Sequence, residues 1–247
     1  MTTVDKAQTY TACLIIIGNE ILSGRTMDKN LSYIGKRCDE LGISMMECRV
    51  IPDDEQEIIA TLKACADKFD YVFTTGGIGP THDDITAASI AKCFNVDLQR
   101  NQEAVDAILT YYGPDKMTEA RLKMADIPAG ASLIDNPVSG APGFQVDNVF
   151  VFAGVPVIMQ AMFEGIIDRL TGGRPMLSTS IMTALPESLL APGLGRIQEH
   201  YPDVSIGSYP FFREGKTGVN LVMRSPDRDR LLAVAEEIAK LVNELEP

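Results

Sequence analysis

A glycine-rich segment followed by two adjacent carboxylates constrains this chain more than any other feature. It runs from Tyr71 to Thr86 and reads YVFTTGGIGPTHDDIT. Its apolar start is typical of a buried strand, and Gly76, Gly77 and Gly79 then let backbone amides approach a ligand without interference from a Cβ atom. Apolar residues at helical spacing follow. The segment therefore predicts a strand, a glycine-rich turn and a helix N-terminus, where an anion is favoured.

The two carboxylates, Asp83 and Asp84, would repel a bare phosphate. A divalent cation lying between carboxylate and phosphate removes that repulsion, so the pattern favours a Mg²⁺-assisted phosphate site. The alternative is a connecting turn in which an aspartate caps the next helix, which is common in α/β folds.

The overall charge restricts the partners of the chain. Its 247 residues include 22 Lys and Arg against 34 Asp and Glu, a formal net charge of −12. A general nucleic-acid binder or a membrane-surface protein would be basic, so we expect neither nucleic acid nor membrane as a partner. No apolar run approaches the roughly 18 residues that cross a bilayer, and the polar start from Met1 to Thr11 does not resemble a secretory signal. We therefore expect a cytoplasmic protein.

The cysteine pattern agrees with a reducing compartment. The five cysteines include no C-x-x-C pair and most lie at apolar positions, so we expect free, buried thiols. The two histidines, His82 and His200, are far apart in sequence, which argues against a zinc site.

Strand and helix patterns alternate through the first part of the chain. Buried strands are predicted over Ala12–Ile17, Ile43–Ile51 and Tyr71–Thr75, each followed by a helix pattern, with a loop over Gly18–Arg25. Short parallel strands with right-handed crossovers form a three-layer α/β sandwich, which binds ligands at the carboxyl ends of its strands. The carboxylates that we expect to meet at this edge are Glu20, Asp53, Asp54, Asp83 and Asp84.

The rest of the chain predicts further helices, a hairpin and a second domain. The predicted elements are helices over Asn101–Tyr112 and Met117–Ala125, a short strand over Ser132–Ile134, strands over Phe144–Val146 and Val149–Ala153, and a helix from Gly154-Val155-Pro156 to Leu170. The glycine-rich stretch Thr171–Pro175 is the best domain boundary, which gives an α/β domain of residues 1–171. Residues 172–247 predict a small α+β domain, whose last helix starts at a cap formed by Ser225 and Pro226.

Three motifs of the first domain carry a resemblance to a known family. They are GNEILSG from Gly18, TTGGIGPTHDD from Thr74 and NPVSGAPGF from Asn136. In this order they resemble the molybdopterin-binding domain, in the version of the competence/damage-inducible protein A family, and the similarity covers about Thr11 to Leu170. Two positions depart from the family pattern: Ser139-Gly140 stands in place of Gly-Thr, and Ala153 in place of a proline.

The resemblance implies the sandwich fold of molybdopterin adenylyltransferases, which is also similar to a domain of eukaryotic FAD synthases. It implies that the glycine loop binds molybdopterin or a nucleotide with Mg²⁺, that Asp84 is the loop carboxylate, and that Asp53 or Asp54 is the second carboxylate. Some relatives instead hydrolyse ADP-ribose or FAD at the pyrophosphate, and a binding or regulatory module without turnover is a third reading. Longer relatives carry a deamidase domain, for which the chain to Pro247 has no room. Because the family's sandwich domains associate, we expect a homo-oligomer, either a dimer or a trimer.

The predicted site combines the three motifs. Its catalytic residues are Asp84, Asp53 and Asp54, and its metal ligands are Asp84 and Asp83. Its ligand-binding residues are Gly18, Asn19, Glu20, Gly76, Gly77, Gly79, Pro80, Thr81, His82, Asn136, Pro137, Gly140, Pro142 and Gly143. Structural roles compete with these assignments, since Asp54 and Glu57 fit a capping box and His82 fits a solvated loop. Arg25 and Lys29 are further candidates for phosphate contacts.

Overall fold

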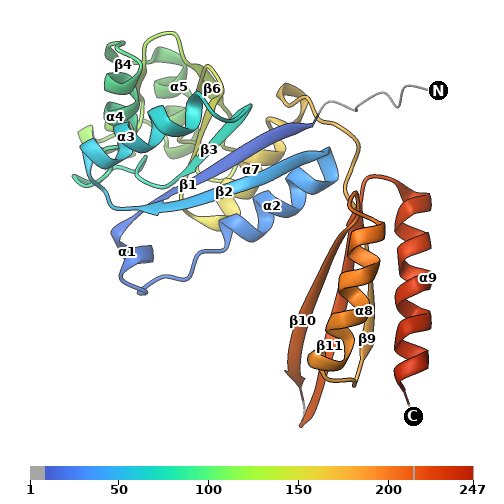
Figure 1. Ribbon diagram of the computed structural model, residues 1–247. Helices are drawn as coiled ribbons and strands as arrows, with labels where there is room; N and C mark the ends of the chain where they lie inside the picture. Colours follow the sequence, from blue (N-terminus) through green and yellow to red (C-terminus); the bar gives the residue numbers. More distant parts are fainter. Residues whose placement is uncertain (1–8, 214, 247) are drawn as a thin grey trace, which may run out of the picture. The chain divides into compact units, whose positions relative to one another are not determined.

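The computed structural model describes residues 9–213 and 215–246 of the chain, so residues 1–8 of the expected first domain lie outside the described part (Figure 1). The chain divides into two compact units, the first up to Gly173 and the second from Arg174. Each unit has its own apolar core. No helix in the described ranges is long and apolar enough to span a membrane.

The first unit is built on a six-stranded sheet with the strand order β2-β1-β3-β8-β7-β6. The strands are β1 (Tyr10–Ile17), β2 (Ile43–Ile51), β3 (Tyr71–Thr75), β8 (Val149–Phe152), β7 (Gly143–Val146) and β6 (Ser132–Ile134). The first four are parallel and the last two are antiparallel. This arrangement confirms the predicted mostly parallel sheet of an α/β sandwich.

Helices cover both faces of this sheet and make the outer layers (Figure 1). On one face lie α3 (Glu55–Ala66), α4 (Thr86–Cys93) and α5 (Gln102–Tyr112), whose apolar residues share a core with the sheet. On the other face lie α2 (Asn30–Leu41) and α7 (Pro156–Glu164). The inner strand β1 is buried from Ala12 onward because helices cover the sheet on both faces, which explains its uninterrupted apolar sequence.

The helix boundaries follow from local chemistry that the sequence shows. Asp54 caps α3, since its Oδ1 accepts hydrogen bonds from the amides of Gln56 and Glu57. Gly42 ends α2 in the left-handed conformation, with a φ of 70°. All five cysteines are free, and Cys13, Cys38 and Cys65 are buried.

Several elements differ from the sequence prediction. A short helix, α1 (Asn19–Leu22), replaces part of the expected loop after β1. Two short strands, β4 (Leu98–Arg100) and β5 (Asp126–Pro128), form an antiparallel pair. The chain between them forms α5, η1 (Pro114–Lys116) and α6 (Glu119–Lys123). Neither strand segment is an apolar run, since β4 reads LQR and β5 reads DIP, so only the pairing reveals them. The helix expected to reach Leu170 stops at Glu164, and a 3₁₀ turn, η2 (Ile167–Arg169), follows.

The second unit is a three-stranded antiparallel sheet with two helices over one face (Figure 1). Its elements are β9 (Leu177–Thr183), α8 (Glu187–His200), β10 (Ser205–Arg213), β11 (Lys216–Ser225) and α9 (Arg228–Leu245). The cap of α9 differs from the prediction. Asp227, rather than Ser225, accepts hydrogen bonds from the first free amides of the helix, and the Ser225 hydroxyl accepts from the Asp227 amide instead.

An ion-pair network fastens α2 to α7 and predicts a pH-dependent stability. Glu164 accepts hydrogen bonds from the Tyr33 hydroxyl at 2.6 Å and from Arg37 Nε at 2.7 Å. Burial raises the pKa of Glu164, but the bonds from Tyr33 and Arg37 outweigh it and leave the pKa lowered. The stabilisation is therefore complete above the ordinary carboxyl pKa and is lost as the pH falls through the folded value.

We expect Glu164→Gln to lower the free energy of unfolding at pH 7 by about 1 kcal/mol or less, because the side chain is 42% exposed and solvent screens the pair. Urea unfolding between pH 3 and pH 8 measures this, and the difference from the wild type should shrink as the pH falls below the ordinary carboxyl pKa. A difference that stays constant over the whole range would contradict the assignment.

Candidate functional site

Two glycines shape the turn after β3. Gly76 has a φ of 102° and Gly77 a φ of 68°, conformations that residues with a Cβ rarely adopt. The surroundings are also too close for a side chain, because a Cβ on Gly76 would lie 2.1 Å from the carbonyl oxygen of Ile17. A Cβ on Gly77 would lie 2.1 Å from Thr86 Oγ1, the hydroxyl that donates to the Gly76 carbonyl. These glycines are therefore required by the turn itself.

The amides of the turn divide into bonded and free groups. The Gly76 amide donates to the carbonyl of Phe152 on β8, so the expectation that Gly76 offers its amide to a ligand is wrong. Within the described residues, the amides of Gly77, Ile78 and Gly79 have no partner elsewhere in the chain. They precede the N-terminus of α4, so this stretch presents unpaired donors where a helix dipole favours an anion.

Asp83 and Asp84 converge on one hydroxyl group. Asp83 Oδ1 and Asp84 Oδ2 each lie 2.5 Å from Thr81 Oγ1, which has one proton to donate. Asp84 Oδ2 also accepts the Thr81 amide at 2.8 Å. The hydrogen bond from Thr81 holds the pKa of Asp83 below its usual value. The result is a pair of close carboxylate oxygens beside the free amides.

A cavity of about 620 Å³ lies beside this turn. Its wall combines the glycine turn, the start of α7 and the excursion between β4 and β5. The predicted site residues that line it are Glu20, Gly76, Gly77, Gly79, Pro80, Asp84 and Asn136. This volume lies within the usual range for small-molecule sites. The cavity also lies at the carboxyl ends of β3 and β8, which is the ligand edge of a parallel sheet.

Cationic side chains that the sequence prediction missed lie at the cavity and beside it. Arg121 and Tyr112 line the cavity, with the Arg121 Cζ atom 4.2 Å from the Tyr112 ring centre. Lys123 donates to the carbonyl of Thr81. These residues follow the glycine turn by a helix and a loop, and no local pattern connects them to it. The predicted candidate Lys29 lies elsewhere, at a smaller cavity beside α2.

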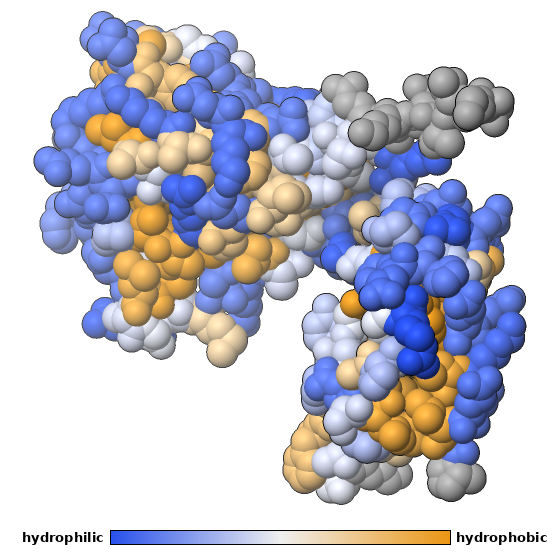
Figure 2. Space-filling view, viewed as in Figure 1, coloured by the Kyte–Doolittle hydropathy of each residue, from blue (hydrophilic) through white to orange (hydrophobic). Residues whose placement is uncertain are grey.

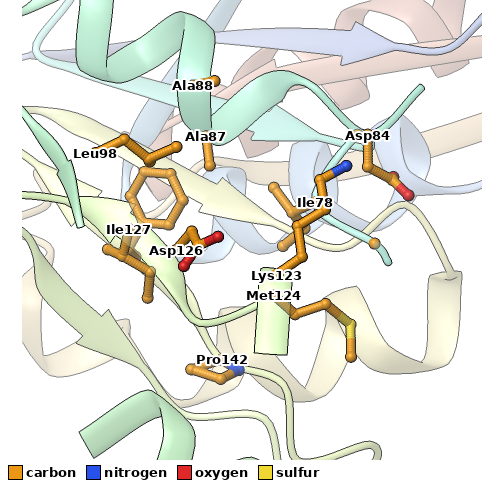
Figure 3. A pocket seen from close by; sticks show the side chains of 13 residues that line it. Ile78, Asp84, Ala87, Ala88, Leu98, Lys123, Met124, Asp126, Ile127 and Pro142 are labelled. Carbon is orange, nitrogen blue, oxygen red and sulfur yellow. The ribbon is translucent and has the colours of Figure 1, made fainter. Parts of the chain in front are cut away.

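Figure 3 shows a second hollow, of about 80 Å³, on the α4 side of the turn. Asp84 and Lys123 lie at one end of it, and the side chains of Leu98 and Ile127 lie at the other. Its lining includes Pro142 of the third motif. The carboxylate of Asp84 thus lies where the two hollows meet.

The other predicted carboxylates do not gather at Asp84. Asp54 caps α3, and Asp53 Oδ2 accepts the amide of Asn19 at 2.9 Å, which ties the turn after β2 to the turn after β1. Neither lines the 620 Å³ cavity, whereas Glu20 does. Across residues 9–213 and 215–246, no three Asp, Glu, His or Cys side chains lie close enough to hold a metal ion together. The expected convergence of five carboxylates is therefore wrong, because two of them serve backbone amides.

The loop of the NPVSGAPGF motif, which starts at Asn136, forms part of the rim of the 620 Å³ cavity. Asn136 is buried, and its side chain bonds within its own loop: Nδ2 donates to Ala141 O and Ser139 Oγ, and Oδ1 accepts from two backbone amides. A Cβ on Gly140 would lie 2.3 Å from Tyr111 Cβ, and one on Gly143 would lie 2.2 Å from Val151 O. Ser139 and Ala153, the two departures from the family pattern, both line the cavity.

The remaining predicted residues are not part of the 620 Å³ wall. These are Gly18, Asn19, Thr81, His82 and Pro137. The His82 side chain is 98% exposed, in agreement with a solvated loop histidine. Thr81 nevertheless belongs to the site, since it bonds both Asp83 and Asp84.

The fold is that of an α/β protein with a cavity of small-molecule size at the carboxyl edge of its sheet. Residues 13–172 match the family described as "Probable molybdopterin binding domain", and residues 175–246 match "FAD synthase, middle domain". The chain therefore belongs to the molybdopterin-binding domain family, which relates it to molybdenum cofactor biosynthesis.

Relatives and a solved structure agree with this membership. A protein of Archaeoglobus fulgidus is 33% identical over 232 residues, which cover 94% of this chain and 97% of that protein. A protein of Pyrobaculum calidifontis is 35% identical over 211 residues, 81% of this chain and 80% of that protein. The crystal structure of the protein CinA, with unknown function, from Thermoplasma acidophilum is 36% identical with a TM-score of 0.62, and the match covers 65% of this chain and 98% of that one.

Proposed function

We propose that the first unit binds a phosphorylated pterin, such as molybdopterin, or a nucleotide, with its phosphate at the turn between Gly77 and Gly79. The free amides of this turn carry the proposal, because they point to an anion at a place where the cavity has room for a whole ligand. The membership in the molybdopterin-binding domain family supports a pterin as the organic part.

A cation is needed to reconcile this ligand with the charge of the site. Asp83 and Asp84 present two close carboxylate oxygens, and hard oxygen donors of this kind suit Mg²⁺. Two carboxylates are sufficient, since Mg²⁺ usually keeps several waters and takes the rest of its ligands from substrate phosphates. When bound, the ion would neutralise charge on a phosphoanhydride, while Arg121 and Lys123 supply further positive charge.

Direct binding tests the proposal. The full chain is titrated calorimetrically with molybdopterin, ATP, ADP-ribose and FAD, each with 5 mM Mg²⁺ or with EDTA, and products are followed by chromatography. We expect at least one of these phosphates to bind in a Mg²⁺-dependent manner. Failure of all four to bind in either condition would overturn the proposal.

A dinucleotide is the second candidate ligand, and one observation favours it. The second unit matches the middle domain of FAD synthase over residues 175–246. The same turn and carboxylates would then serve a Mg²⁺-dependent pyrophosphatase acting on FAD or ADP-ribose. Release of the mononucleotides from FAD in the assay above distinguishes this activity from adenylyl transfer to molybdopterin and from binding without turnover.

We also propose that the protein is a homo-oligomer, either a dimer or a trimer. Exposed apolar side chains support this: Met182 is 70% exposed, Tyr209 58% and Phe212 73% in the second unit, and Tyr111 is 52% exposed on α5. Figure 2 shows further apolar surface on the second unit beside α8 and α9. Such surfaces are usually covered by another subunit in a closed assembly. Light scattering at micromolar concentration should give a multiple of the 26.9 kDa chain mass. A single monomeric species that does not change on concentration would refute the expectation.

A further inference from the structure

A small polar chamber adjoins the 620 Å³ cavity on the side of α2 and α7. We define it by Glu20, Asp28, Lys29, Asn30 and Thr75, which line a hollow of about 50 Å³. It shares Glu20, Thr26, Gly154 and Pro156 with the larger cavity, so the two hollows have a common wall. The chamber has room for one or two groups the size of a water molecule.

Two buried oxygen atoms of the chamber residues have no partner. Asn30 is 3% exposed and Thr75 is fully buried, and neither Asn30 Oδ1 nor Thr75 Oγ1 makes a hydrogen bond within the described chain. The orientation of Asn30 is set by its Nδ2 atom, which donates to the carbonyl of Gly154 at 2.9 Å. Its free atom is thus an acceptor. Buried polar atoms are nearly always satisfied, and these two belong to residues that line one hollow, so together they indicate a partner there that donates hydrogen bonds.

The charged residues around the chamber define that partner further. Glu20 and Asp28 add carboxylate acceptors, so an anionic group would be repelled. Lys29 offsets part of their charge, and in the described part of the chain no three Asp, Glu, His or Cys side chains gather to hold a metal ion, which favours a neutral donor over a metal cation. The partner is therefore a small uncharged N–H or O–H group.

We propose that the polar chamber is the specificity subsite of the larger cavity, and that it accepts hydrogen bonds from an amino or hydroxyl group at the end of the ligand remote from the phosphate. The orientation rests on the function proposed above, since it places the phosphate at the glycine turn. The two ends of the binding site then select different groups of the ligand. The glycine turn offers amide donors to the phosphate, and the chamber offers oxygen acceptors to the amino or hydroxyl group. A heterocyclic amino group and a sugar hydroxyl have the same donor chemistry and are distinguished by experiment.

Thr75→Val is the variant that tests this assignment, because valine keeps the shape of threonine and removes only the unpartnered hydroxyl. Thr74→Val is its matched control. Thr74 is equally buried with an unpartnered Oγ1 atom, yet it lines neither the chamber nor the larger cavity. Successive residues of a strand point to opposite faces, so the two hydroxyls lie on opposite sides of the sheet. Neither variant loses a hydrogen bond within the chain, so both should fold.

The probes are two pairs of nucleotides, measured by calorimetry with Mg²⁺ on the full chain. GMP and IMP differ by the exocyclic amino group that guanine shares with a pterin, and AMP and 2′-deoxy-AMP differ by one hydroxyl. We expect the wild type to prefer the donor-bearing member of one pair by about tenfold, the usual effect of one buried hydrogen bond. Thr75→Val should reduce that preference to less than twofold, and Thr74→Val should keep it. The responsive pair identifies an amino or a hydroxyl group.

Equal discrimination by Thr75→Val and the wild type would overturn the inference and leave the chamber as a site for buried water. The absence of any preference in the wild type, or of any binding, would also overturn it. Asp84→Asn separates this result from the proposed function. If Asp84→Asn loses binding while Thr75→Val keeps the wild-type preference, only the subsite is wrong. If Thr75→Val loses the preference while Asp84→Asn binds as the wild type does, the subsite stands and the carboxylate site is wrong.

Discussion

Replacing Gly76 with alanine is expected to lower the free energy of unfolding by about 3 kcal/mol or more. The backbone has a φ of 102° at this residue, and the added Cβ would lie 2.1 Å from the carbonyl oxygen of Ile17. That oxygen belongs to the end of β1, a strand covered on both sides, so neither partner can move aside easily. Urea unfolding followed by circular dichroism measures the loss, and we expect it to exceed that of any single surface substitution.

Gly24→Ala provides the control for backbone conformation alone. Gly24 also has a positive φ, of 70°, but a Cβ there would meet no atom within 4 Å. We therefore expect a loss of only about 1 kcal/mol, the ordinary cost of this conformation for a residue with a Cβ atom. If the two alanine variants are equally stable, the close approach of Gly76 to Ile17 does not limit the turn.

The second large effect is expected for Asp84→Asn, which should reduce Mg²⁺-dependent ligand binding or turnover by about 100-fold. The carboxylate lies at the junction of two hollows and shares the Thr81 hydroxyl with Asp83. An asparagine oxygen can still accept the Thr81 amide, so the melting temperature should change little. Asp168→Asn removes the same charge from an exposed residue that lines neither hollow and is the matched control. A folded Asp84→Asn protein with wild-type activity would refute the site.

Substitution of Gly77 is a weaker test of phosphate binding than its place in the motif suggests. A valine there would block the free amides, but its Cβ would also lie 2.1 Å from Thr86 Oγ1 and displace the hydroxyl that holds the Gly76 carbonyl. Loss of binding in this variant could therefore result from distortion of the turn as well as from blocked phosphate contacts. Asp84→Asn separates the two because it leaves the backbone unchanged.

Much of the sandwich was predictable because its signals are local. The predicted bounds of β2 and β3 match the structure, and Asp54 caps α3 as its sequence indicates. Apolar periodicity, capping residues and glycines act over a few neighbours, so a single sequence displays them. The glycine and aspartate motif was informative for the same reason, since its turn and its carboxylate pair are contiguous.

The sequence by itself thus determined the α/β architecture, the carboxyl edge at which the cavity lies, and the family resemblance. Only the tertiary structure decided which groups face the cavity. It pairs the Gly76 amide with Phe152, directs Asp53 toward Asn19, and brings Arg121 to the cavity wall. It also leaves one oxygen atom each without a partner on Asn30 and Thr75, two residues that line the same small chamber. These hydrogen bonds and contacts join groups that are far apart in the sequence and come together only when the layers pack. No short-range sequence pattern encodes them.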